Sequence, residues 1–122
     1  SKIREAVALQ DAARDALDLA RRNALFNAQV GYTGVNSSVA SVRAVAQAVQ
    51  SSEVALQSNK LGQEVGVRTN LDVLNVQQTV FTQRRNLAQA YFNYLLNQLR
   101  LRAAVGTLTE QDLEALNRRL AE

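Results

Sequence analysis

The segment "GQEVGVRTNLDVLN", residues 62 to 75, decides the fold, because it holds the only obvious break in an otherwise helical sequence. Gly62 can end a preceding helix in a left-handed cap, and Gly66 permits a second unusual backbone step. Thr69 is followed three positions later by Asp72, a spacing that resembles a capping box and favours the start of a new helix. We therefore predict a turn between two helices at this point.

Long helices are predicted on both sides of this turn, which spans residues 62–70. Residues 1–61 contain no strong breaker, and residues 71–105 form a return helix that Gly106 can cap. The chain has no proline and only five glycines, so little stops a helix once it has begun. The stretch "GYTGVNSS", residues 31–38, lowers helix propensity, and we expect a bend or a close helix contact there rather than a break.

A short third helix is predicted within residues 106–122. Thr109 provides a capping residue and Asp112 supports it from the first turn. Leucines fall on one face of this segment, namely Leu113, Leu116 and Leu120. The predicted fold is therefore all-α, a long antiparallel helical hairpin followed by a short C-terminal helix.

Composition narrows the classes of function. The 47% hydrophobic content is carried by Ala, Leu and Val, which favours thin packing between helices. Fourteen basic and eleven acidic residues give a net charge of +3, but no run of Lys and Arg forms a stripe, so we expect no nucleic-acid partner. No stretch approaches the roughly 18 consecutive apolar residues of a membrane-spanning helix. Because methionine is absent and the helical pattern begins at Ser1, we expect a piece of a longer protein; removal of an initiator methionine is the alternative.

The return helix carries apolar residues along two seams that each repeat every seven positions. The first seam, interrupted by polar residues, runs through Leu71, Leu74, Gln78, Phe81, Arg85, Ala88, Phe92, Leu95 and Leu99. The second runs through Val73, Gln77, Val80, Arg84, Leu87, Tyr91, Tyr94, Gln98, Leu101 and Val105. A dimeric coiled coil needs one seam, so two seams indicate two helical neighbours and a wall of side-by-side helices. An elongated three-helix bundle is the alternative fold.

Residues that usually carry catalysis are absent. The chain has no histidine and no cysteine, which removes the commonest general base, thiol nucleophile and metal ligands. Asp11, Asp15 and Asp18 alternate with arginines, as expected for solvated ion pairs on a helix rather than for a metal site. The Gly62 to Gly66 segment lacks the Lys-Ser/Thr pair of a phosphate loop. We therefore expect no enzymatic activity, no cofactor and no metal.

Arg68 and Asp72 remain as the candidate functional pair, about one helical turn apart near the predicted apex. For one exposed copy, the favoured explanation is a local salt bridge, or an aspartate that interacts with the helix dipole. In a symmetric assembly a functional role for Asp72 gains weight, because aspartates repeated around a narrow opening concentrate negative potential.

Several motifs in the same order resemble the C-terminal part of TolC-like outer-membrane efflux proteins. The first is a Val-Gly-x-Arg-Thr turn followed by Asp-Val-Leu, here at residues 65–69 and 72–74. Ala-Tyr-x-x-Tyr-Leu follows at residues 90–95, and Gly-Thr-Leu-x-x-x-Asp-Leu at residues 106–113. The resemblance is strong over residues 50–117 and more diffuse before them.

The resemblance implies a homotrimer whose long helices form a tunnel, an α-barrel, through the periplasm of a Gram-negative bacterium. In the full-length protein, strands that precede this segment would anchor the tunnel in the outer membrane. Such channels serve drug efflux or type I protein secretion. The turn would be the periplasmic tip, which meets a periplasmic adaptor (a membrane fusion protein) and an inner-membrane transporter.

The family also implies roles for individual tip residues. Arg68 would help to hold the entrance closed, and Asp72 would belong to an acidic ring at the pore. The adaptor would meet Val65, Gly66, Val67, Arg68 and Thr69. Two departures affect this picture: Asn75 stands where a second pore aspartate is common, and Gln63 stands where a tyrosine of the closed-state latch is common.

Two further functional classes remain open. A coiled-coil adaptor or scaffold hairpin with no channel role would need one dominant seam. An amphipathic lipid-binding helix would need a large apolar face bordered by Lys and Arg, which is not evident here.

Overall fold

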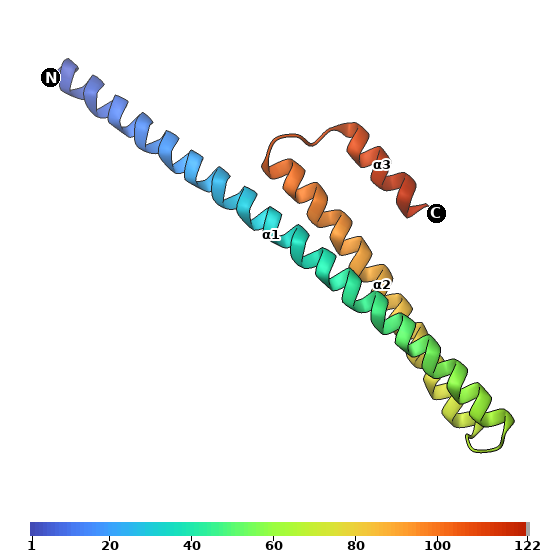
Figure 1. Cartoon of the computed structure of the whole chain (residues 1–122). Helices are drawn as coiled ribbons and strands as arrows, with labels where there is room; N and C mark the ends of the chain where they lie inside the picture. The colour runs from blue at the N-terminus through green and yellow to red at the C-terminus, as the bar shows by residue number, and fades with distance from the viewer. Residues whose placement is uncertain (122) are drawn as a thin grey trace. The chain divides into compact units, whose positions relative to one another are not determined.

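The computed structural model describes residues 1–121 as three helices: α1 (Lys2–Glu64), α2 (Asn70–Ala104) and α3 (Glu110–Leu120) (Figure 1). The described residues contain no β-strand. The predicted all-α hairpin with a short third helix is confirmed.

The end of α1 differs from the sequence-based expectation. Helix α1 continues to Glu64, three residues beyond Leu61, and Gly62 lies inside its last turn. The prediction of a left-handed cap at Gly62 is therefore wrong, because the positive φ of 81° belongs to Gly66. At the other end of the hairpin, Gly106 has a φ of 75° and caps α2 as expected.

The chain divides into two compact units. One comprises residues 35–97, and the other comprises residues 1–34 with the described residues from Gln98 onward. Helix α1 passes through residues 31–38 without a break. A Cβ placed on Gly31 would lie 3.2 Å from Leu101 Cδ1, so the close helix contact expected in this stretch is found at Gly31.

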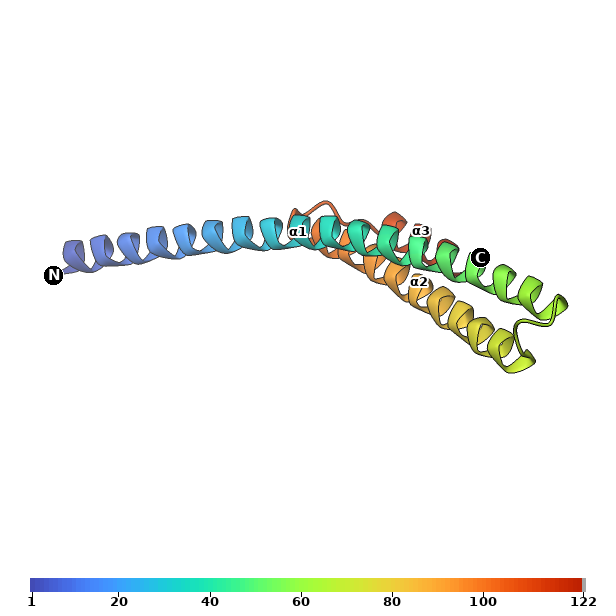
Figure 2. The same ribbon diagram turned by 60° about the horizontal axis from the view of Figure 1, so that its bottom comes forward.

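In the unit of residues 35–97, α1 and α2 run antiparallel and side by side, as two views agree (Figures 1 and 2). All buried side chains of the described residues belong to this unit: Ser38, Ser52, Val73, Val80, Ala90 and Leu95. Helix α1 supplies the serines and α2 the apolar residues. Small side chains on α1 let the two helices approach closely, so the interface is thin.

The two predicted seams of α2 have different surroundings. Val73 and Val80, from the second seam, are buried in the hairpin. From the first seam, Leu71, Leu74 and Phe81 remain 65%, 61% and 62% exposed. Leu95 departs from this division, since it lies in the first seam but is only 3% exposed. Near the tip, α2 therefore keeps an apolar face that nothing in the described chain covers.

Polar contacts also join α1 to α2 inside this unit. Asn97 Nδ2 donates a hydrogen bond of 2.5 Å to Ser38 Oγ. Arg84 donates to Glu53 Oε1 through Nε at 3.1 Å and Nη2 at 2.6 Å. The Asn97–Ser38 contact is half-buried and the Arg84–Glu53 contact is exposed. Together they hold α1 and α2 in register at two places along the hairpin.

The other unit contains a polar contact between α2 and α3. Arg102 of α2 forms an ion pair with Asp112 of α3. Asp112 also accepts hydrogen bonds of 3.0 Å from the backbone N–H and the hydroxyl of Thr109, which confirms the predicted start of α3. Exposed apolar side chains are numerous on the α1 segment of this unit: Ile3, Val7, Leu9, Leu17, Leu19, Leu25, Phe26 and Val30. Across residues 1–121, no helix combines the length and apolarity required to span a membrane.

Candidate functional site at the interhelical tip

The tip, residues 62–75, begins with a helix end built around Gly66. The Gly66 N–H donates to the carbonyl of Gln63 at 3.1 Å, and the Val67 N–H donates to the carbonyl of Gly62 at 2.8 Å. This pair of bonds, with Gly66 in the left-handed region, is a Schellman motif. It satisfies two carbonyls at the end of α1 and turns the chain sharply.

Arg68 lies back against the last turn of α1. Its backbone N–H donates to the Gly62 carbonyl at 3.1 Å, so that carbonyl accepts two hydrogen bonds. A Cβ placed on Gly62 would lie 2.7 Å from Arg68 Cγ and 3.5 Å from Val67 Cγ2. The stem of Arg68 therefore occupies the space that a side chain at position 62 would need.

Thr69 and Asp72 form the predicted capping box at the start of α2. The Thr69 N–H donates to Asp72 Oδ2 at 2.9 Å, and the Asp72 N–H donates to Thr69 Oγ1 at 3.1 Å. The hydrogen bond from the Thr69 backbone lowers the pKa of Asp72, helped by the Thr69 side chain and, more weakly, by the charge of Arg68; partial desolvation opposes the shift. The folded tip therefore favours the carboxylate form of Asp72.

Arg68 and Asp72 do not form an ion pair within 4.0 Å, although both residues lie in the described chain. The local salt bridge considered from the sequence is thus not made. Asp72 is engaged mainly by the start of its own helix. The tip therefore presents a guanidinium and a carboxylate that are not directly neutralised by each other.

Two amide side chains flank this pair. Gln63 Nε2 donates to Asn70 Oδ1 at 3.3 Å, which links the end of α1 to the start of α2. Asn75 is exposed on α2, and its backbone carbonyl accepts a hydrogen bond of 3.1 Å from Thr79 Oγ1. Of the two predicted latch residues, Gln63 is already engaged within its own chain.

Apolar side chains project from the outer surface of the tip. Val65 is 67% exposed and Val67 is 76% exposed, on either side of Gly66. Leu61 and Leu71 are exposed next to them along the chain. Such side chains offer apolar area to a partner, with the charges of Arg68 and Asp72 nearby to orient it.

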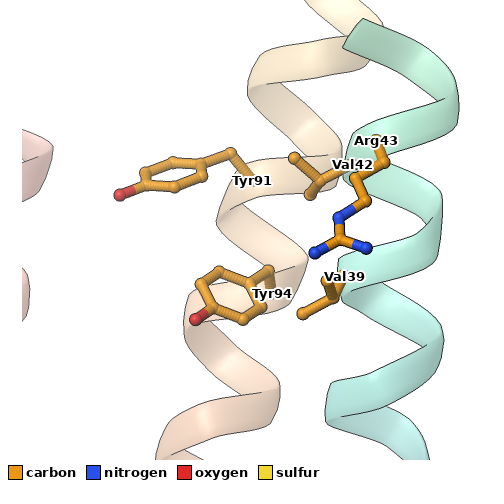
Figure 3. A pocket seen from close by; sticks show the side chains of 5 residues that line it. All are labelled: Val39, Val42, Arg43, Tyr91 and Tyr94. Atoms are coloured by element: carbon orange, nitrogen blue, oxygen red, sulfur yellow. The ribbon is translucent and has the colours of Figure 1, made fainter. Parts of the chain in front are cut away.

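A shallow hollow of about 220 Å³ lies farther along the same unit, between α1 and α2. It is lined by Val39, Val42, Arg43, Tyr91 and Tyr94. The tyrosine ring centroids are 6.2 Å apart, and their hydroxyls point away from α1 (Figure 3). The sequence placed both tyrosines on a seam but did not indicate a hollow, which forms where small valines of α1 face these rings.

Within residues 1–121, no group of three or more acidic, histidine or cysteine side chains is placed to hold a metal ion. The tip presents hydrogen-bonding groups, charges and exposed apolar side chains.

Comparison with known proteins finds similarity to outer-membrane and secretion proteins. A family model described as outer membrane efflux protein matches residues 1–107. Outer membrane protein TolC of Escherichia coli K12 is 39% identical over 90% of this chain and 22% of its own length. TolC of Vibrio cholerae is 37% identical over 87% of the chain and 24% of its own length. The alkaline protease secretion protein AprF of Pseudomonas aeruginosa is 33% identical over 87% of the chain and 20% of its own length. The chain thus spans about a fifth to a quarter of the length of these relatives.

Proposed function

Because the chain belongs to the outer membrane efflux protein family, we propose that it forms the periplasmic tunnel segment of an outer-membrane channel. The full-length protein would sit in the outer membrane of a Gram-negative bacterium, and this segment would reach into the periplasm as part of a homotrimer. The channel would serve drug efflux or type I protein secretion. Relatives named for protease secretion support the second use.

The observation that carries this proposal is the uncovered apolar face of α2 beside the tip. Leu71, Leu74 and Phe81 stay exposed although the other seam of α2 packs on α1. A helix with apolar residues on two faces needs a second helical neighbour. In a tunnel built from several copies, the neighbouring hairpin would supply it.

The tip would be the docking end of the tunnel. Val65 and Val67 offer exposed apolar area, and Gly66, Arg68 and Thr69 shape the turn that presents it. In the proposed assembly a periplasmic adaptor contacts these five residues. An inner-membrane transporter supplies the energy, and the channel itself carries out no catalytic step.

The entrance would be controlled by the charged residues of the tip. Arg68 is not neutralised by Asp72 in its own chain, so its guanidinium can serve a contact to a neighbouring copy that holds the entrance closed. Gln63 would contribute less to this latch, because its amide already bonds to Asn70. Asp72, with Asn75 one helical turn later, would line the opening, where three carboxylates attract cations.

An adaptor or scaffold hairpin without a channel role is the less favoured alternative. Such a hairpin would leave the second apolar face of α2 exposed to solvent. The matching relatives are also named as outer-membrane or secretion proteins.

Site-specific photo-crosslinking in cells tests the docking role. A photoreactive residue placed at Val67 of the full-length protein is expected to crosslink to the adaptor, and the product should vanish when the adaptor gene is deleted. The matched control is Gln57, an exposed polar residue of α1. Equal adaptor crosslinking from Gln57 and Val67, or none from Val67 while export continues, would contradict docking at the tip.

A further inference from the structure

Gly62 lies in the last turn of α1, where the backbone gives no reason for a glycine. Its backbone is helical, and only Gly66 and Gly106 have positive φ in the described chain. Glycine weakens a helix relative to alanine, because it loses more backbone freedom on folding. A glycine at this position therefore calls for an explanation in its surroundings.

The surroundings contain the stem of Arg68. A Cβ on Gly62 would meet Arg68 Cγ at 2.7 Å and Arg68 Cβ at 3.4 Å. These atoms are the first two of the arginine side chain and not its mobile end. Relief of the clash needs either a new χ1 rotamer for Arg68 or a shift of the tip backbone.

The tip backbone is the more firmly held of the two. The N–H groups of Val67 and Arg68 both donate to the Gly62 carbonyl, and Thr69 is fixed by the capping box with Asp72. Rotation about χ1 of Arg68 breaks none of these bonds. A methyl group at position 62 would thus redirect the Arg68 side chain and leave the turn in place.

We propose that Gly62 is a positioning residue for Arg68: the missing side chain lets the arginine stem lie on α1 and so sets the direction of its guanidinium. This inference rests on the proposed function, in which Arg68 holds the tunnel entrance closed. Gly66 has a separate role, since a Cβ there would meet nothing within 4 Å and only its φ of 81° demands glycine.

Conductance of the full-length protein in planar bilayers tests the inference with four proteins: wild type, Gly62→Ala, Arg68→Ala and the double variant. Gly62→Ala is expected to raise the resting conductance towards that of Arg68→Ala. The double variant should conduct no more than Arg68→Ala alone, because both changes act through one side chain. Thermal stability of Gly62→Ala should not fall, since alanine favours the helix. Additive effects, or a wild-type conductance for Gly62→Ala beside a raised one for Arg68→Ala, would overturn the inference.

The structure of the full-length Gly62→Ala variant separates this inference from the proposed function. A changed χ1 rotamer of Arg68 with an unchanged Thr69–Asp72 capping box would support the positioning role, even if Arg68→Ala proved to have no effect on conductance. The absence of an effect of Arg68→Ala on conductance would count only against the proposed role of Arg68 in closing the entrance. An Arg68 side chain that keeps its direction in the variant would overturn the positioning role whatever the conductance.

Discussion

Asn97 of α2 donates a hydrogen bond of 2.5 Å to Ser38 of α1, joining residues that are 59 positions apart in the sequence. Ser38 is buried, in an interface whose apolar core is small. Seams that repeat every seven residues can pair in several registers, and a polar pair at one level favours a single register. This bond and the Arg84–Glu53 ion pair therefore specify how the hairpin pairs.

Removal of the Ser38 hydroxyl should loosen the hairpin locally. Ser38→Ala is expected to cost about 1 kcal/mol, the usual net value of one intramolecular hydrogen bond. Hydrogen exchange of α1 and α2 amides in the full-length protein measures the change as faster exchange around Ser38 and Asn97. Ser37→Ala is the matched control, because Ser37 is next to Ser38 in the sequence but its own side chain is exposed. Equal effects of the two substitutions would show that the bond contributes nothing specific.

The Arg84–Glu53 ion pair should matter less and should depend on salt. Both side chains are about half exposed, so a double-mutant cycle is expected to give a coupling of about 0.2–1 kcal/mol that shrinks as salt is added. Glu53→Gln and Arg84→Gln, singly and together, form the cycle. A coupling that does not respond to salt would mean that the contact acts through packing instead of charge.

The start of α2 should lose stability in acid. Hydrogen bonds from Thr69 hold the pKa of Asp72 below its ordinary value of 3.8, so the folded state favours the carboxylate. This contribution is fully present above the ordinary pKa and is lost as the pH falls through the lower pKa of the folded state. Exchange of the first-turn amides of α2 should therefore accelerate over that acidic range. In Asp72→Asn the acceleration should disappear; its persistence would assign the effect to another group.

Gly66→Ala should strain the tip backbone. A residue with a side chain pays roughly 1–2 kcal/mol in the left-handed region, and Gly66 has a φ of 81° with open space around it. Gly66→Asn should be milder, because asparagine tolerates this conformation better than alanine does. Faster amide exchange over residues 63–70 measures the strain. If alanine and asparagine behave alike, backbone strain is not the reason for the glycine.

Much of this architecture could be predicted from the sequence, because its signals are local. The absence of proline, the Thr-x-x-Asp spacings and Gly106 indicated three helices and the starts of α2 and α3. The left-handed cap was wrongly expected at Gly62, since Gly62 and Gly66 both follow a long helical pattern, whereas the unusual backbone step expected at Gly66 is found. Only the fold shows that Gly66 closes the Schellman motif and that Gly62 makes room for Arg68.

Contacts between distant residues lay beyond the sequence patterns. The predicted seams did not reveal that Asn97 pairs with Ser38, or that Gln63 bonds to Asn70, because these contacts depend on the register of the hairpin. Ser38 and Ser52, the buried serines of α1, mark where the two helices meet, but no sequence pattern showed them as buried. The roles of Arg68, Asp72 and Asn75 remain predictions, since each depends on neighbouring copies of the chain.

The most direct test of the proposed channel is the conductance of the full-length protein in planar bilayers. Wild type is compared with Asp72→Ala and Arg68→Ala, with and without multivalent cations on the periplasmic side. The tunnel account predicts a small conductance that cations block, relief of the block in Asp72→Ala, and a larger resting conductance in Arg68→Ala. A protein that forms no pore even as Arg68→Ala would contradict the account.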